Sequence, residues 1–206
     1  MSALEVETPH GPARVHLRPV AEPRAALVLG HGAGGGVEAR DLTAAAEAAH
    51  SLELTVALVE QPYRVAGRRS PAPARQLDAA WTAVAERLAA RELRGLPLVA
   101  GGRSSGARVA CRTAAATGAA GVLCLAFPLQ PPARASGTQA PSRLAELEEV
   151  TVPTLVVQGT RDRFGMPPAG PRRTVVQVAA DHALRTDLAA VADAVRRWLT
   201  VLLETV

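Results

Sequence analysis

The chain has 206 residues, the length of one ordinary domain, and needs no disulfide or metal to stabilise its core. Aromatic residues make up only 2% of it, which argues against the stacking platforms of RNA and single-strand binding proteins. Lysine is absent, and the 23 arginines exceed the 19 acidic residues by only four. We interpret this small excess as a mixed, solvated surface and expect no nucleic-acid partner.

The cysteines and the apolar runs indicate the cellular compartment that we expect for the protein. Cys111 and Cys124 lack the spacing of a metal or redox motif, and we interpret them as free thiols in a reducing compartment. The first residues lack the pattern of a signal peptide, and apolar runs such as Gly121–Phe127 are far too short to span a bilayer. We therefore expect a cytoplasmic monomer or homodimer with no membrane partner, no metal and no cofactor.

Short apolar runs alternate with longer amphipathic ones along the whole chain. The predicted elements, in chain order, are a strand at Val15–Leu17, a strand at Ala26–Leu29, a helix at Leu42–Ser51, a strand at Thr55–Val59, a helix at Arg75–Glu92, a strand at Leu98–Ala100, a helix at Ala107–Thr117, a strand at Gly121–Phe127, a short helix at Arg143–Val150, strands at Thr154–Gln158 and Thr174–Val178, and a helix at Asp187–Leu203.

This alternation predicts an α/β fold in which a mostly parallel sheet is covered by helices on both faces. No linker divides the chain, so we expect a single domain over residues 1–206. Functional side chains in such sheets lie just past the carboxyl ends of the strands. The motifs that matter should therefore follow the predicted strands.

The strand at Leu98–Ala100 runs into the motif Gly-x-Ser-x-Gly, with Ser104 at its centre. A serine on a sharp turn between a strand and a helix has strained backbone angles, and the residues two before and two after it must be small. Gly102 and Gly106 meet this condition for Ser104, whereas Arg103 would occupy the first small position if Ser105 were the nucleophile. We therefore predict Ser104 as the nucleophile. The alternative is a glycine turn with a helix-capping serine.

Two further polar residues follow later strands, as a Ser-Asp-His triad would require. Asp162 follows Thr154–Gln158, and His182 follows Thr174–Val178. A serine hydroxyl needs an imidazole to take its proton and a carboxylate to orient that imidazole, so we predict Ser104, Asp162 and His182 as a triad. Asp181 is an alternative orienting carboxylate, although a sequence neighbour rarely points at the same edge of the ring.

The glycine-rich turn HGAGGG follows the strand at Ala26–Leu29. A tetrahedral intermediate needs two preorganised N–H donors for its oxyanion. We predict the backbone N–H of Ser105 as one donor and that of Ala33 or Gly34 as the other. The alternative is a phosphate-binding loop, but the run lacks the Lys-Ser/Thr pair of nucleotide fingerprints. We expect His31 to be structural.

The joint order of HGAGG, GRSSG, VVQGTRD and DHALR, each after a strand, resembles the α/β-hydrolase superfamily over the whole chain. The chain is most similar to the small cap-less branch near dienelactone hydrolases. More narrowly, EQPYRVAGRRSPAP and FPLQPP resemble the group that contains testis-expressed protein thirty and the third subunit of the NSL chromatin complex. Dienelactone hydrolases proper carry a cysteine nucleophile where this chain has Ser104. The resemblance implies serine-hydrolase chemistry without fixing the substrate.

The stretch after Gly121–Phe127 is too short for a large cap, so we expect an open site that accepts a small-molecule ester or thioester. Tyr63, Arg68 and Arg69 follow another strand end and are predicted substrate contacts, with charge-assisted bonds to an anionic group. The alternative is that these arginines, with Arg64, are structural or solvated. Two other functions stay open, namely a binding module with little turnover and an acyltransferase.

Overall fold

The computed structural model describes residues 2–132 and 137–206. In these residues the chain forms eight strands and six helices. The strands are β1 (Ser2–Val6), β2 (Ala13–Arg18), β3 (Ala25–Gly30), β4 (Leu54–Glu60), β5 (Leu98–Arg103), β6 (Gly121–Leu125), β7 (Thr154–Gly159) and β8 (Arg173–Val178). The helices are α1 (Arg40–His50), α2 (Pro62–Val65), α3 (Ala74–Ala90), α4 (Ser105–Thr113), α5 (Leu144–Glu148) and α6 (Leu188–Leu202).

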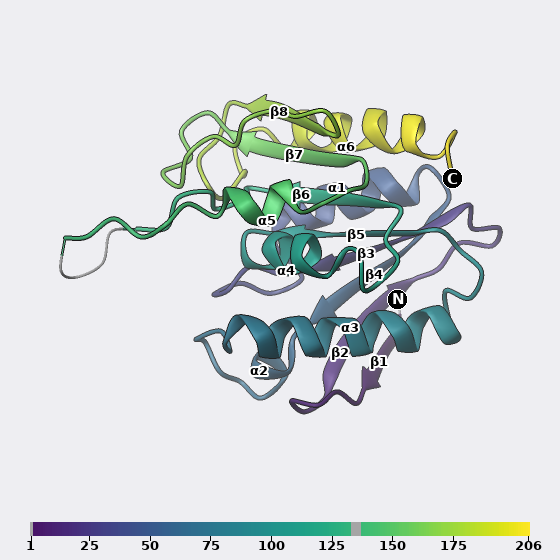
Figure 1. Ribbon diagram of the computed structural model, residues 1–206. Coiled ribbons are helices and arrows are strands. Elements are labelled where there is room, and N and C mark those ends of the chain that lie inside the picture. Colours follow the sequence, from purple (N-terminus) through teal and green to yellow (C-terminus); the bar gives the residue numbers. More distant parts are fainter. Residues whose placement is uncertain (1, 133–136) are drawn as a thin grey trace.

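The strands form one sheet in the order β1-β2-β4-β3-β5-β6-β7-β8. The pairs β1–β2 and β2–β4 are antiparallel, and every later pair is parallel. Helices α3 and α4 cover one face, while α1 and α6 cover the other (Figure 1). The predicted architecture, a mostly parallel sheet flanked by helices on both faces and without a large cap, is confirmed over the described residues.

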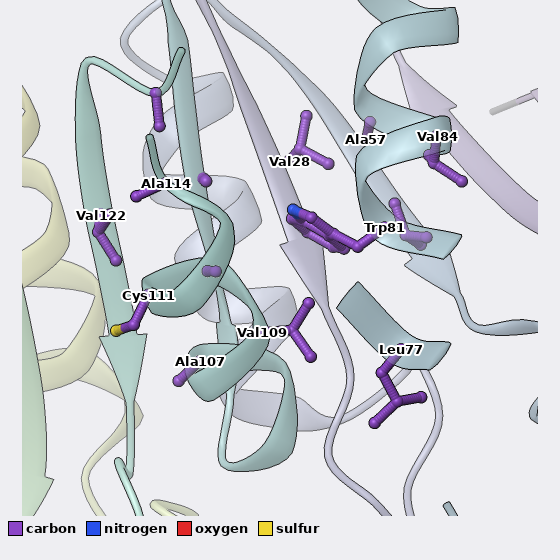
Figure 2. Packing of buried hydrophobic residues seen from close by; sticks show 14 of the residues in the cluster. Val28, Ala57, Leu77, Trp81, Val84, Ala107, Val109, Cys111, Ala114 and Val122 are labelled. Carbon is purple, nitrogen blue, oxygen red and sulfur yellow. The ribbon is translucent and has the colours of Figure 1, made fainter. Parts of the chain in front are cut away.

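The core forms two layers because the central strands are apolar on both faces. In β3, Ala26 and Val28 pack on the side of α3 and α4, whereas Leu27 and Leu29 pack on the side of α1 and α6. Figure 2 shows Trp81 of α3 lying beside Val28 in the first of these layers. Alternation of side chains along a strand produces this division. The two layers hold the sheet, and with it the carboxyl ends of its strands, in a fixed arrangement.

Two short elements were not predicted from the sequence. Strand β1 pairs with β2 at the edge of the sheet, and the four-residue helix α2 lies in the segment predicted as a loop. The predicted strand at Gly121–Phe127 ends at Leu125 in the structure. Among the described residues, no helix is both long enough and apolar enough to cross a membrane.

Candidate active site

Ser104 lies at the turn between β5 and α4 with φ 52° and ψ −106°. Its backbone N–H donates to the carbonyl of Leu125 over 2.9 Å. The turn leaves no room for side chains around it. A Cβ on Gly102 would lie 2.5 Å from the carbonyl oxygen of Gly30, and a Cβ on Gly106 would overlap the same carbonyl. The glycines thus let the strand and helix approach closely enough to present Ser104 at the end of the sheet.

The structure brings Ser104, His182 and Asp162 together from three loops. Ser104 Oγ lies 3.0 Å from His182 Nε2, and His182 Nδ1 lies 2.8 Å from Asp162 Oδ2. Because a carboxylate only accepts, Nδ1 carries the proton and Nε2 is left to accept from the serine hydroxyl. This arrangement can draw a proton from Ser104 and stabilise the imidazolium that results.

The Asp162 carboxylate is fully buried and is held by several donors. Its Oδ1 accepts from the N–H of Phe164 over 2.9 Å, and its Oδ2 accepts from Gln158 Nε2 over 2.8 Å as well as from His182. Asp181, the alternative orienting residue, is exposed, and its carboxylate accepts from the N–H of Ala183. The geometry therefore places Asp162, and not Asp181, beside the imidazole.

An aromatic ring covers the His182 imidazole. Phe164 meets it edge to face, with the ring centroids 4.4 Å apart and an interplanar angle of 61°. The guanidinium of Arg163 lies over the Phe164 ring, 4.9 Å from the ring centroid. The Phe164 ring limits the orientations open to the imidazole and shields it from water on that side.

The glycine-rich turn after β3 is anchored by His31. The ring Nε2 accepts from the N–H of Gln61 over 3.1 Å, which leaves Nδ1 as the donor to the carbonyl of Gly32 at 2.8 Å. Both nitrogens are thus used by backbone groups, and the ring is neutral in this arrangement. Burial lowers the pKa of His31. The residue is structural, and it joins the turn to the end of β4.

The predicted oxyanion donors lie in this turn and at the start of α4. Ser105 is the first residue of α4, so its N–H has no acceptor within the helix. The turn lies close to Ser104, because a Cβ on Gly32 would lie 3.7 Å from the Cβ of Ser104. Ala33 and Gly34 follow directly in the same turn. Backbone N–H groups from both segments can therefore converge on an oxygen bound at Ser104.

The expected substrate contacts fall into two groups. The prediction of Tyr63 as a substrate contact is corrected by its position in the structure. Tyr63 is only 2% exposed, and its hydroxyl donates to the carbonyl of Ala33 over 2.7 Å. Burial raises its pKa to about 12, so it supports the turn as a neutral phenol. Arg68 and Arg69 are exposed, and in the described part of the chain no contact joins either of them to Ser104, Asp162 or His182.

The sequence reasoning missed two polar residues that support the site. Gln158 is completely buried at the end of an otherwise apolar strand, and its amide reaches Asp162. Arg103 forms an ion pair with Asp41 and donates to the carbonyl of His182. A polar residue that ends an apolar strand was the available signal in both cases. Across residues 2–132 and 137–206, no group of three His, Cys, Asp or Glu residues is placed to hold a metal ion.

The comparisons with known proteins agree with this architecture. A lidless α/β serine hydrolase from Xanthomonas campestris is 21% identical, with a TM-score of 0.75 over 97% of this chain and 94% of that chain. Est1E from Butyrivibrio proteoclasticus is 14% identical, with a TM-score of 0.79 and full coverage of both chains. The dienelactone hydrolase from Anabaena variabilis is 17% identical, with a TM-score of 0.73 over 97% and 96% of the two chains. At these identities the likeness concerns the fold.

No curated protein matches the chain in sequence. A family model for the alpha/beta hydrolase domain, however, matches residues 23–189. This span includes β3 to β8, the turn after β3, Ser104, Asp162 and His182. The protein therefore belongs to the alpha/beta hydrolase domain family.

Proposed function

We propose that the protein is a serine hydrolase that cleaves an ester or thioester through an acyl-enzyme on Ser104. The observation that carries this proposal is the hydrogen-bonded path from Ser104 Oγ through His182 to the buried carboxylate of Asp162, with distances of 3.0 and 2.8 Å. A serine hydroxyl is a weak nucleophile at neutral pH unless a base takes its proton during the attack. The path supplies that base and holds it in the required tautomer.

In the acylation step, Ser104 Oγ attacks the substrate carbonyl carbon while its proton moves to His182 Nε2. The carbonyl oxygen becomes an oxyanion, for which the N–H groups of Ser105 and of Ala33 or Gly34 are the proposed donors. The carbon–oxygen or carbon–sulfur bond to the leaving group then breaks. His182 returns the proton to the departing alcohol or thiol, and the acyl group stays on Ser104.

In the deacylation step, water replaces the leaving group. His182 takes a proton from the water as its oxygen attacks the acyl carbon, and the second oxyanion uses the same donors. When the bond to Ser104 Oγ breaks, His182 returns that proton to the serine. The products are a carboxylic acid and the free hydroxyl of Ser104.

A fluorophosphonate probe tests this function directly, because it labels only an activated serine. We expect labelling at Ser104 in the intact protein and in Ser105→Ala, and none in Ser104→Ala. Peptide mapping identifies the modified residue. A label on Ser105, or no label on the folded protein, would contradict the proposal.

The substrate is to be identified with p-nitrophenyl esters and acyl-CoA thioesters of varied chain length. Turnover of either series supports hydrolysis, whereas product formation that depends on an added alcohol or amine would identify an acyltransferase.

Arg68 and Arg69 are proposed contacts for anionic acyl groups. We also propose, from the sequence motifs, a place near the testis-expressed protein thirty group.

A further inference from the structure

Arg103 is the residue between Gly102 and Ser104, and its side chain contacts three segments of the site. Its Nε lies 2.9 Å from Oδ2 of Asp41, in the first turn of α1. Its Nη2 donates to the backbone carbonyl of His182 over 3.1 Å. Its Nη1 lies against Gly32, where an added Cβ would come within 2.7 Å. One guanidinium therefore joins the nucleophile turn, the histidine loop and the glycine-rich turn.

Asp41 is the fixed end of this contact. Its side chain is only 1% exposed, and its Oδ1 accepts from the N–H of Leu42 over 3.0 Å. Burial raises the pKa of Asp41, and the charge of Arg103 opposes that rise. A buried ion pair contributes little net stability compared with apolar residues of similar size. The pair is therefore better explained by what the guanidinium holds than by stability alone.

The backbone of His182 is held directly by this guanidinium. In the described part of the chain, Arg103 makes the only hydrogen bond to the backbone of His182. The imidazole has to stay near 3.0 Å from Ser104 Oγ to act as a base. If the loop carrying it moved by about 1 Å, the rate of the reaction would fall by up to about 100-fold.

We infer that Arg103, anchored by Asp41, is a positioning residue that holds the backbone of His182 and the turn at Gly32 in register with Ser104. This inference rests on the proposed function. The role uses the planar fork of arginine, in which Nε lies in the ion pair with Asp41 while a second nitrogen, Nη2, donates to the His182 carbonyl. A lysine carries its charge on one nitrogen, which cannot occupy both of these positions.

Two variants distinguish the loss of the positioning contacts of Arg103 from the loss of its charge and from unfolding of the chain. Arg103→Lys keeps the positive charge beside Asp41 but loses the fork. Arg103→Met leaves a buried carboxylate unpaired and can unfold the chain, so it is combined with Asp41→Asn, which removes both charges. The control is Arg112→Lys, because Arg112 has a similar side-chain exposure, 17% against 18%, and a paired contact with Asp78 of α3.

The rates of fluorophosphonate labelling and the kcat and KM for p-nitrophenyl acetate are measured in each variant, together with the melting temperature. We expect Arg103→Lys and the double variant to lose about 10- to 100-fold in labelling rate and kcat, with KM within about two-fold of the intact protein. Arg112→Lys is expected to keep the intact rates.

Two results would overturn the inference. One is an Arg103→Lys protein that reacts at the intact rate. The other is an equal loss in Arg112→Lys, since that would show a general effect of weakening α4. If the intact protein itself is not labelled at Ser104, the proposed function fails and the inference falls with it. The labelling of the intact protein thus distinguishes the two failures.

Discussion

Ser104 occupies a backbone conformation that residues with a Cβ rarely adopt. Its φ of 52° and ψ of −106° lie outside the main allowed regions. Such a residue costs on the order of 1–3 kcal/mol and persists only where its surroundings hold it. Here the bond from its N–H to Leu125 and the close packing of Gly102 and Gly106 against Gly30 supply that hold. The strain is consistent with a residue placed for its hydroxyl.

The amide of Gln158 has one orientation that its neighbours accept. Its Nε2 lies 2.8 Å from Asp162 Oδ2, 2.9 Å from the carbonyl of Gly165 and 3.0 Å from the carbonyl of Phe127. If the amide were flipped, its oxygen would face three acceptors. The buried Oε1 has no hydrogen-bond partner among residues 2–132 and 137–206, which is the cost of this orientation. Gln158 thus holds the carboxylate that lies beside the His182 imidazole.

Replacing Asp162 with asparagine tests whether its carboxylate orients the His182 imidazole. Asp162→Asn has nearly the same shape but no longer holds the proton on His182 Nδ1, so we expect a folded protein whose kcat falls by about 10⁴-fold. Asp181→Asn, at the exposed neighbour, is the control and should keep the intact kcat. Steady-state assays with p-nitrophenyl acetate measure both. The reverse pattern would assign the orienting role to Asp181.

At the scale of elements, the approach of α4 to β3 depends on a glycine in each segment. A Cβ on Gly106 would overlap the carbonyl of Gly30, and a Cβ on Gly30 would lie 3.1 Å from the Trp81 ring of α3. Backbone atoms cannot move aside as a flexible side chain can. The start of α4, and with it the Ser105 N–H, is therefore placed by contact between two backbones.

We expect Gly106→Ala to lower the free energy of unfolding by about 1–3 kcal/mol, because α4 has to move away from Gly30 to admit the methyl group. The same movement should lower the rate of fluorophosphonate labelling at Ser104. Gly35→Ala is the control, since a Cβ there meets only the Gly32 carbonyl at 3.9 Å. Urea titrations give the stabilities. Equal stability of the two variants would argue against close packing at Gly106.

The local sequence pattern carries part of this architecture. The motifs around Ser104, Asp162 and His182 could be placed because each follows an apolar run that reads as a strand. The same reasoning does not predict strand β1 or helix α2. Helix α2 has only four residues, and β1 is a short edge strand without a clear apolar run. The position of β3 between β4 and β5 depends on contacts distant in sequence.

Side-chain direction within loops also lies beyond a local pattern. Tyr63 and Arg68 follow the same strand, yet the first turns inward to the Ala33 carbonyl and the second is exposed. The ion pair of Arg103 with Asp41 joins two residues that lie 62 positions apart in the sequence. Such contacts arise only when the sheet and its helices assemble. A local sequence pattern therefore predicts the candidate triad more readily than the residues that contact it.

For the molecule as a whole, buried polar groups near the carboxyl edge of the sheet link the site to global stability. His31 is 3% exposed and bonds to backbone groups through both ring nitrogens. Protonation at Nε2 would replace an acceptor with a donor facing the N–H of Gln61. Burial of the ring lowers its pKa in the folded protein from an ordinary value of 6.5. We therefore expect acid to lower the free energy of unfolding through protonation of His31.

The sign of the effect follows from proton binding in the two states. Below a pH of 6.5 the unfolded chain binds a proton at His31 while the folded protein, with its lowered pKa, does not. Stability from this group is complete above 6.5 and is lost as the pH falls toward the lowered pKa. A single proton contributes a slope of at most about 1.4 kcal/mol per pH unit.

We expect His31→Gln to be less stable at neutral pH, because its side chain cannot reproduce both ring contacts, but to lose less stability on acidification. Urea titrations between pH values of about 5 and 7.5 measure this slope. His10→Gln, at an exposed position, controls for the loss of an imidazole. A His31→Gln protein whose stability falls with pH as steeply as that of the intact protein would show that His31 does not couple protonation to unfolding.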